Sequence, residues 1–287
     1  MTNQLQTISP IDGAVIVRRA YASAEQMRGA LERARTAQAV WRGVPIAQRA
    51  LAVSKGVDAF VARKAEIAEE LTRQMGRPLR YTPGEVGGFE TRARHMIGIA
   101  GEALHDVVPA AQSGFNRFIR RDPLGVVLVI APWNYPLLTA VNAVVPALMA
   151  GNAVLLKHSA QTPLAAERIV EAFSQVGLPD GLLQFIHTDH EGTHALIKAP
   201  QVDGVCFTGS VVGGAAVERA AVGRFIQVGL ELGGNDPAYV RADALLGHAV
   251  ETLVDGAFFN SGQSCCGIQR IYVQRSVYSS MEWARPW

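Results

Sequence analysis

Hydrophobic positions recur at helical spacing over residues 23–102. Ser23, followed by acidic and amide residues, is a typical helix start. Gly76, followed by Arg77 and Pro78, is a typical helix end. The spacing predicts helices over four segments, residues 23–41, 45–61, 63–75 and 85–102. Residues 1–20 precede them as an extended arm that contains a strand at residues 14–17.

Short apolar runs alternate with helical segments after residue 115. Residues 126–130 form a continuous β-branched run, typical of a strand buried on both faces. Similar runs follow at residues 153–156, 182–186, 205–207 and 225–230. Helical segments separate them at residues 138–150, 163–176, 190–199 and 211–221. This alternation predicts an α/β fold with a parallel sheet and helices on both faces. Residues 115–121, which alternate apolar and polar, predict an edge strand or a hairpin before that sheet.

Two of the three cysteines stand after the next predicted helix, residues 249–259. The small and amide residues N-S-G-Q-S precede Cys265 and Cys266, and a strand is predicted at residues 271–273. A thiol on such a tight turn can be exposed in a cleft while its backbone N–H points to the same place, as a nucleophilic cysteine requires. The alternative is that both thiols are small buried hydrophobes.

Composition narrows the class of protein. The hydrophobic share is 49%, which allows a sizeable core, and the length suggests about two domains. The formal net charge is +2 and no basic run occurs, which argues against a nucleic-acid partner. Three cysteines do not make a disulfide framework, and residues 1–10 show no signal peptide. We therefore expect a cytoplasmic protein.

One uncharged stretch, residues 123–156, is long enough to raise the question of a membrane span. Pro132, Pro136, Pro146 and Gly151 interrupt it, whereas a spanning helix needs about 20 predominantly apolar residues. We interpret the stretch as strand, loop, buried helix and strand, and we expect no membrane partner. We also assign no residue to a metal site.

Ligands on a parallel sheet bind at the carboxyl ends of its strands, where this chain carries polar residues. Asn134 follows the first strand, between two prolines, and its amide can stabilise an oxyanion or form an Asx turn that caps the next helix. Lys157 ends the second strand. A cation there predicts the phosphate or ribose of a nucleotide, and the alternative is a side chain that snorkels to solvent.

Two further strand ends carry glycine-rich motifs. The fourth strand leads into T-G-S-V-V-G-G, with Gly209, Ser210 and Gly214 around a helix start that favours an anion. The usual dinucleotide fingerprint G-x-G-x-x-G is absent. The fifth strand leads into E-L-G-G, in which Glu231 is a candidate general base whose pKa burial would raise. The alternative is a solvated or capping carboxylate.

Taken together, the motifs P-W-N-Y-P, a strand-ending Lys157, F-T-G-S, E-L-G-G and F-F-N-x-G-Q-x-C resemble those of the NAD(P)-dependent aldehyde dehydrogenase superfamily in order and spacing. The resemblance extends from the N-terminal arm to about Tyr278. By matched position, Cys265 resembles the nucleophile, Glu231 the general base and Asn134 the oxyanion-hole donor. The cofactor-binding residues that the resemblance implies are Trp133, Lys157, Gly209, Ser210 and Gly214.

The resemblance implies a small-molecule aldehyde as substrate and NAD or NADP as cofactor. Cys265 would add to the aldehyde, Asn134 would hold the oxyanion, and hydride transfer would leave a thioester that Glu231 helps water to hydrolyse. Ala160 stands where many NAD-preferring relatives carry an acid, and this leaves NADP open.

The resemblance also implies an aldehyde-dehydrogenase-like architecture with a Rossmann-type core and a truncated catalytic domain. We expect a helical part at residues 1–114, a dinucleotide-binding core at 115–232 and the start of an incomplete catalytic domain at 233–287. Relatives carry a further segment that completes this domain and supplies their oligomerisation strand, which argues against a homo-oligomer here. Residues 279–287 lack any periodicity.

Two other interpretations of the function are possible. The first is an inactive remnant that at most binds a dinucleotide. The second is a cysteine hydrolase based on Cys265, which needs a histidine base. We expect none of the seven histidines to fall in the strand-end motifs.

Overall fold

The computed structural model describes residues 4–281, so residues 282–287 of the aperiodic end lie outside the described part. The chain divides into two compact units. Unit 1 contains residues 1–208 and 212–230, and unit 2 contains residues 209–211 and 231–287.

Unit 1 is built on a five-stranded sheet in the order β5-β4-β3-β6-β7. The strands are β3 (Val126–Ala131), β4 (Ala153–His158), β5 (Leu183–Phe185), β6 (Gly204–Thr208) and β7 (Gln227–Glu231). β3 pairs in parallel with β4 and with β6, and β4 pairs in parallel with β5. Every residue of β3 is buried, as its apolar run predicts. The predicted α/β fold with a parallel sheet is confirmed.

The strand order reverses at β3, because β4 lies on one side of it and β6 on the other. The register sets Ile130 on β3 beside Lys157 on β4 and beside Phe207 on β6. In open sheets of this kind, ligands bind outside the carboxyl ends of the strands at such a reversal. The ends of β3, β4 and β6 are therefore the natural place for a ligand in unit 1.

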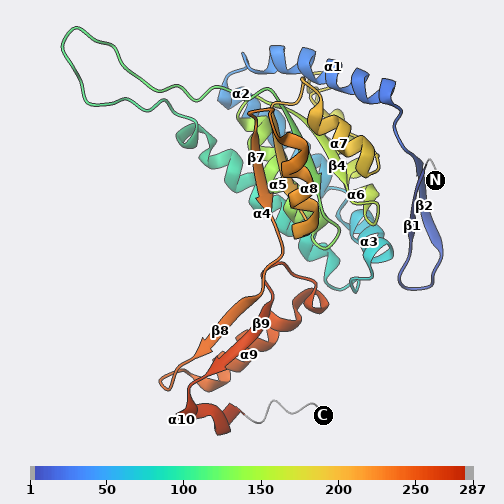
Figure 1. The fold of residues 1–287 in the computed structure, drawn as a ribbon, viewed down its shortest axis with the longest axis vertical. Coiled ribbons are helices and arrows are strands. Elements are labelled where there is room, and N and C mark those ends of the chain that lie inside the picture. Colours follow the sequence, from blue (N-terminus) through green and yellow to red (C-terminus); the bar gives the residue numbers. More distant parts are fainter. Residues whose placement is uncertain (1–3, 282–287) are drawn as a thin grey trace. The chain divides into compact units, whose positions relative to one another are not determined.

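Helices cover this sheet and add a further layer (Figure 1). Those that follow strands are α5 (Pro136–Met149), α6 (Pro163–Ser174), α7 (His190–Lys198) and α8 (Val211–Ala221). Those before the sheet are α1 (Ala24–Trp41), α2 (Ile46–Val61), α3 (Lys64–Met75) and α4 (Thr82–Ala103). α1 contacts β3, β4 and β5, whereas α4 packs on α5 and α2 packs on α6.

Local signals explain where these helices begin and end. Ser23 and Gln26 form a capping box, in which each side chain bonds the other residue's backbone N–H. Gly76 ends α3 in the left-handed conformation, with φ 80°. α4 begins at Thr82 rather than at the predicted Glu85, because Pro83 is well suited to a first helical turn.

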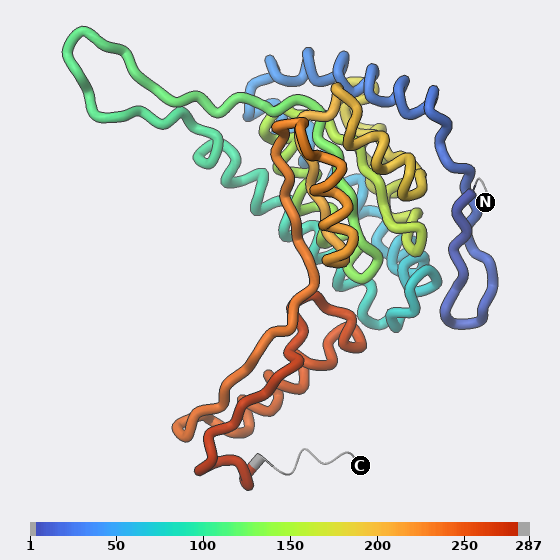
Figure 2. Tube along the Cα trace, viewed as in Figure 1, coloured from blue at the N-terminus to red at the C-terminus, as the bar shows by residue number. Residues whose placement is uncertain are grey.

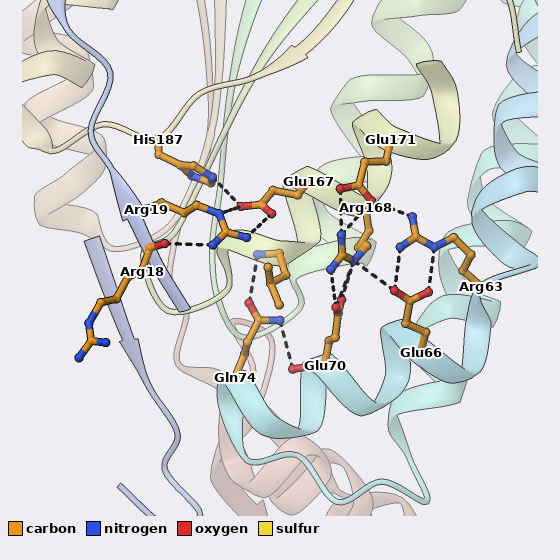
Figure 3. Close-up of polar contacts among 11 residues, drawn as sticks. Arg18, Arg19, Arg63, Glu66, Glu70, Gln74, Glu167, Arg168, Glu171 and His187 are labelled. Carbon is orange, nitrogen blue, oxygen red and sulfur yellow. Dashed lines mark hydrogen bonds and ion pairs between the residues drawn. The ribbon is translucent and has the colours of Figure 1, made fainter. Parts of the chain in front are cut away.

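Ion pairs join α3 to α6 (Figure 3). Arg168 on α6 reaches Glu70 on α3 at 2.6 Å and Glu171 at 2.8 Å. Arg63, at the start of α3, reaches Glu66 and Glu171 at 2.8 Å each. Because these side chains are partly exposed, each ion pair contributes little to stability.

Glu167 forms a more buried cluster beside that network (Figure 3). Arg19, on the N-terminal hairpin of β1 (Gln4–Ile8) and β2 (Val15–Ala20), donates Nε and Nη2 to the two carboxylate oxygens at 2.8 Å each. His187 Nε2 lies 2.9 Å from Oε1 of the same carboxylate. Burial acts to raise the pKa of Glu167, but the hydrogen bonds to His187 and Arg19 outweigh it and lower the pKa to about 2. The carboxylate thus ties β2 to α6.

Residues 104–125, between α4 and β3, form a long loop. Figure 2 shows it as a green segment that extends away from the helices of unit 1. Antiparallel bridges join Val107 to Ile119 and Gln112 to Phe115, so the hairpin prediction holds and the edge-strand prediction does not. Within this hairpin, Ile119 is 62% exposed and Phe115 is 66% exposed.

The last strand of the sheet also differs from its prediction. The run at residues 225–230 predicts a strand buried on both faces, but β7 begins only at Gln227. Phe225 has φ 54° and is fully exposed, so it belongs to a turn. Exposed and half-buried residues alternate along β7, as expected of an edge strand.

Unit 2 contains a two-stranded parallel sheet and one long helix. β8 (Asp236–Val240) pairs with β9 (Ile268–Val273), and α9 (Leu246–Phe258) packs on β9, which leads to a short helix, α10 (Arg275–Tyr278). A Cβ at Gly256 would lie 2.5 Å from the Ile268 side chain, so glycine permits the close approach of helix and strand. Sequence patterning does not predict β8, because Pro237 argues against a strand interior.

Among residues 4–281, no helix has the length and apolar character needed to cross a membrane. The uncharged stretch folds as β3, a loop, α5 and β4, which is the interpretation reached from its prolines and glycines.

Candidate active site

The loop after β3 carries Trp133 and Asn134 between Pro132 and Pro136. Trp133 is 39% exposed, and Asn134 is half-buried. The residue that precedes α5 as its N-cap is Tyr135, and it makes no side-chain cap bond. The Tyr135 carbonyl accepts from the Thr139 hydroxyl at 2.7 Å, which closes the first turn of α5 behind the loop.

His158 is the last residue of β4, so the expectation that no histidine falls in a strand-end motif is wrong. Its ring is buried, and Nε2 lies 2.9 Å from the Pro136 carbonyl oxygen. Burial lowers the pKa of His158 to about 3, so the ring is neutral at physiological pH and Nε2 carries the donated proton. His158 therefore holds the loop that carries Asn134. In the sequence, the signal for this role is the histidine directly after the strand-ending Lys157.

Lys157 precedes it on β4, beside Ile130 of β3. Burial lowers the pKa of its ammonium group, and the charge of Asp189 acts in the opposite direction. The Lys157 ammonium group forms no hydrogen bond or ion pair with any residue that the structure describes. A half-buried ammonium group without such a bond favours an anionic or polar ligand.

The F-T-G-S segment leads from β6 into α8. The Gly209 N–H donates to the Glu231 carbonyl at 3.0 Å, which extends the pairing of β6 with β7 by one bond. Ser210 is exposed, whereas Gly214 is buried in the first turn of α8. The start of a helix carries a partial positive charge from the helix dipole, which favours an anion there.

Glu231 ends β7 and is exposed, rather than buried between its flanking leucines. The chain then passes through Gly233 and Gly234 toward β8. A Cβ at Gly234 would lie 2.6 Å from the Cys265 carbonyl oxygen, so only glycine lets the segment pass this close to the cysteine turn. The structure thereby brings the E-L-G-G segment and Cys265 together within unit 2.

The turn before the cysteines has an unusual backbone. Asn260, Ser261 and Gly262 have φ values of 53°, 58° and 73°, so three consecutive residues adopt the left-handed region. The Gln263 N–H donates to the Asn260 carbonyl at 3.1 Å and closes the turn. The free thiols of Cys265 and Cys266 are both exposed, so the alternative of two buried hydrophobes is wrong.

The Cys265 thiol is not activated by its surroundings in unit 2. Partial burial raises its pKa, and the neighbouring Cys266 raises it further. Because the thiolate is the reactive form, Cys265 needs a proton acceptor or a nearby positive charge before it can attack a substrate.

A family model described as the aldehyde dehydrogenase family matches residues 1–283. The chain belongs to this family. Solved structures share the fold: the crystal structure of PnpE in complex with nicotinamide adenine dinucleotide has a TM-score of 0.91 at 30% identity, and the match covers 97% of this chain and 57% of that one.

Two dehydrogenases are similar over the same region. The NADP-dependent glyceraldehyde-3-phosphate dehydrogenase of Bacillus halodurans C-125, solved with NADP, has a TM-score of 0.91 at 31% identity and covers 98% of this chain and 60% of its own. The NAD(P)+ succinate semialdehyde dehydrogenase Sad of Escherichia coli K12 is 32% identical over 278 residues, which are 96% of this chain and 59% of that protein. The chain thus spans about three-fifths of the length of these relatives.

Proposed function

We propose that this chain carries the dinucleotide-binding core and the catalytic nucleophile of an NAD(P)-dependent aldehyde dehydrogenase. In this proposal, residues 1–114 are the helical part, 115–232 the dinucleotide-binding core and 233–287 the start of the catalytic domain. The observation that carries the proposal is the close approach of Gly234 to the Cys265 carbonyl. It sets the segment of the proposed general base, Glu231, beside the turn of the proposed nucleophile.

The residues of the sheet edge fit a bound dinucleotide. Lys157 offers an ammonium group with no described protein partner, suited to the adenine ribose. Gly209, Ser210 and Gly214 surround the start of α8, where backbone N–H groups suit a pyrophosphate. Trp133 is partly exposed on the loop after β3, which suits the nicotinamide end. When bound, the cofactor accepts the hydride.

The chain's own residues would perform the remaining steps. The Cys265 thiol would first lose its proton to solvent. The thiolate sulfur would then form a bond to the aldehyde carbon, and the Asn134 amide with the Cys265 N–H would hold the oxygen as it becomes negative. Departure of the hydride leaves a thioester on Cys265. Glu231 then takes a proton from water, whose oxygen displaces the sulfur and releases the carboxylic acid.

Semialdehydes are the substrate class that we propose. The relatives include a succinate semialdehyde dehydrogenase from Escherichia coli and an alpha-ketoglutaric semialdehyde dehydrogenase from Bacillus subtilis, the latter 34% identical over 257 residues. Ala160, exposed after β4, puts no negative charge near the adenine ribose. Both NAD and NADP are therefore proposed as cofactors.

The test is the reduction of NAD and NADP by this chain with a series of short semialdehydes. Cys265→Ala should abolish turnover, whereas Cys266→Ala should retain it, since the proposal gives the second thiol no step. Equilibrium binding of both cofactors should be measured on the same samples.

Cofactor binding without Cys265-dependent turnover would overturn the dehydrogenase proposal and favour a chain that only binds a dinucleotide. Ester hydrolysis that survives Cys265→Ala would show that the cysteine is not the nucleophile. The oligomeric state should be recorded by sedimentation, since members of the family are expected to be homo-oligomers.

A further inference from the structure

A buried ion pair holds the loop that carries Asn134, and no step of the proposed reaction uses it. Glu85 on α4 pairs with Arg77, which follows α3, and the two side chains are 1% and 7% exposed. Charges are removed from water in this way only where further hydrogen bonds compensate the loss of hydration. Burial raises the pKa of Glu85, whereas Arg77 and two backbone N–H groups act to lower it.

Those backbone N–H groups belong to the first turn of α5. Glu85 Oε1 accepts from the Leu137 N–H at 2.9 Å and more weakly from the Leu138 N–H at 3.4 Å. Neither donor has a partner inside its own helix, because both lie in the first turn. A carboxylate at this position also interacts favourably with the helix dipole. Glu85 therefore fixes the start of the helix that the loop enters.

Arg77 holds the other end of the same segment. Its Nη2 donates to the Asn134 carbonyl at 2.6 Å. Its guanidinium also lies over the Tyr135 ring, 4.9 Å from the centroid, at a distance suited to a cation–π contact. Arg77 and Glu85, which pair with each other, thus bind the two ends of the backbone segment 134–138.

We propose that Arg77 and Glu85 are positioning residues that set the Asn134 amide for oxyanion stabilisation. This inference rests on the proposed function, in which Asn134 is the donor. An oxyanion donor is effective because it is oriented before the reaction begins. A displacement of about 1 Å can reduce a rate by about a hundredfold, so fixing the backbone of this loop has a direct kinetic consequence.

Amide hydrogen exchange in the full chain tests the positioning without turnover. The single variant E85Q leaves the Arg77 charge buried without its partner, which can unfold a protein. The double variant R77M/E85L removes both charges and is therefore measured beside it. In R77M/E85L, exchange over residues 134–138 should be faster by on the order of tenfold, because the N–H groups lose a charged acceptor. E167Q is the matched control, since Glu167 is also a buried carboxylate paired with arginine in unit 1. It should leave exchange over residues 134–138 unchanged.

Kinetics tests the link to Asn134. R77K keeps a positive charge for Glu85 but shortens the reach to the Asn134 carbonyl. With a semialdehyde and saturating NAD(P), R77K should lower kcat by about tenfold to a hundredfold with KM within about twofold. E167Q should keep the native kcat.

Each outcome has one meaning. Unchanged exchange over residues 134–138 in a folded R77M/E85L overturns the positioning role. Faster exchange with native kcat in R77K overturns the link to Asn134. Absence of Cys265-dependent turnover in the native chain overturns the proposed function, and the exchange experiment still decides whether the ion pair sets this loop.

Discussion

Cys265 combines an exposed position with a thiol that is harder to ionise than a free cysteine. The two facts have different causes. The left-handed residues Asn260 to Gly262 form the turn that precedes the exposed thiol, whereas partial burial and the neighbouring Cys266 disfavour the thiolate. Any reactivity of Cys265 must therefore come from groups that its own turn does not supply.

Cys266→Ala should make Cys265 more reactive, because the substitution removes one of the two causes of its raised pKa. The alkylation rate of Cys265 at neutral pH should rise by about twofold to tenfold as the thiolate fraction increases. Iodoacetamide labelling over a pH series, followed by mass spectrometry of the Cys265 peptide, measures this. Cys206→Ala, which alters a half-buried thiol in β6, should leave the curve unchanged. Identical curves for the Cys266 variant and the native chain would contradict the assignment.

Ala160→Glu should shift cofactor preference toward NAD. A carboxylate after β4 would repel the 2′-phosphate of NADP and accept a hydrogen bond from the 2′-hydroxyl of NAD. NADP affinity should fall by about tenfold or more, while NAD affinity is retained or improved. Titration of both cofactors measures the ratio. Ala160→Gln adds the same volume without charge, and an equal effect of the two variants would argue against an electrostatic cause.

At the scale of elements, the sequence predicts most of unit 1 because each segment carries its own signal. The continuous apolar run of β3 predicts a buried strand, and Ser23 and Gly76 mark helix ends. The failures have physical reasons. Pro237 argues against a strand where β8 lies, so β8 is not predicted. Phe225 is apolar but lies before the edge strand β7, with a positive φ.

The sequence predicts only part of the candidate site. Most residues that would touch ligand stand at or just after strand ends, which a periodicity analysis can find, and so does His158, which holds the loop of Asn134. Arg77 and Glu85 do not: they lie at a helix end and a helix start, and each has an ordinary role there. Only the fold shows that both reach the loop of Asn134.

Glu167, on α6, should make the free energy of unfolding depend on pH. Its folded pKa of about 2 lies below the ordinary value of 4.5, so its contribution to stability is fully present above about pH 4.5 and is lost as the pH falls toward 2. Glu167→Gln should lower the free energy of unfolding at neutral pH by about 2 kcal/mol and flatten its decline in acid. Urea unfolding at neutral and acidic pH measures both effects.

Asp58→Asn is the control for that experiment, because Asp58 pairs with Arg94 at an exposed position. Its free energy of unfolding should change by less than about 1 kcal/mol. An acid profile of Glu167→Gln that parallels the native profile would show that the cluster with Arg19 and His187 does not titrate as described.

At the scale of the whole molecule, the loop at residues 104–125 should be the first site of proteolysis. It has few backbone bonds and almost every residue is exposed, so it can enter a protease without unfolding the sheet. Limited trypsin digestion should cleave first after Arg117, Arg120 or Arg121, and mass spectrometry identifies the fragments. Replacing these three arginines by glutamine should delay the first cut by about tenfold. An earliest cut inside α1 or α4 would contradict this expectation.

Ser261 stands in the left-handed region between two residues that share it. A non-glycine residue in this conformation is destabilised by roughly 1 kcal/mol. In laboratory evolution toward heat resistance, glycine is therefore the substitution that selection should favour at position 261. A glycine would also make the turn before Cys265 more flexible. Under the proposed function, selection for heat resistance and selection for catalysis would therefore act on this position in opposite directions.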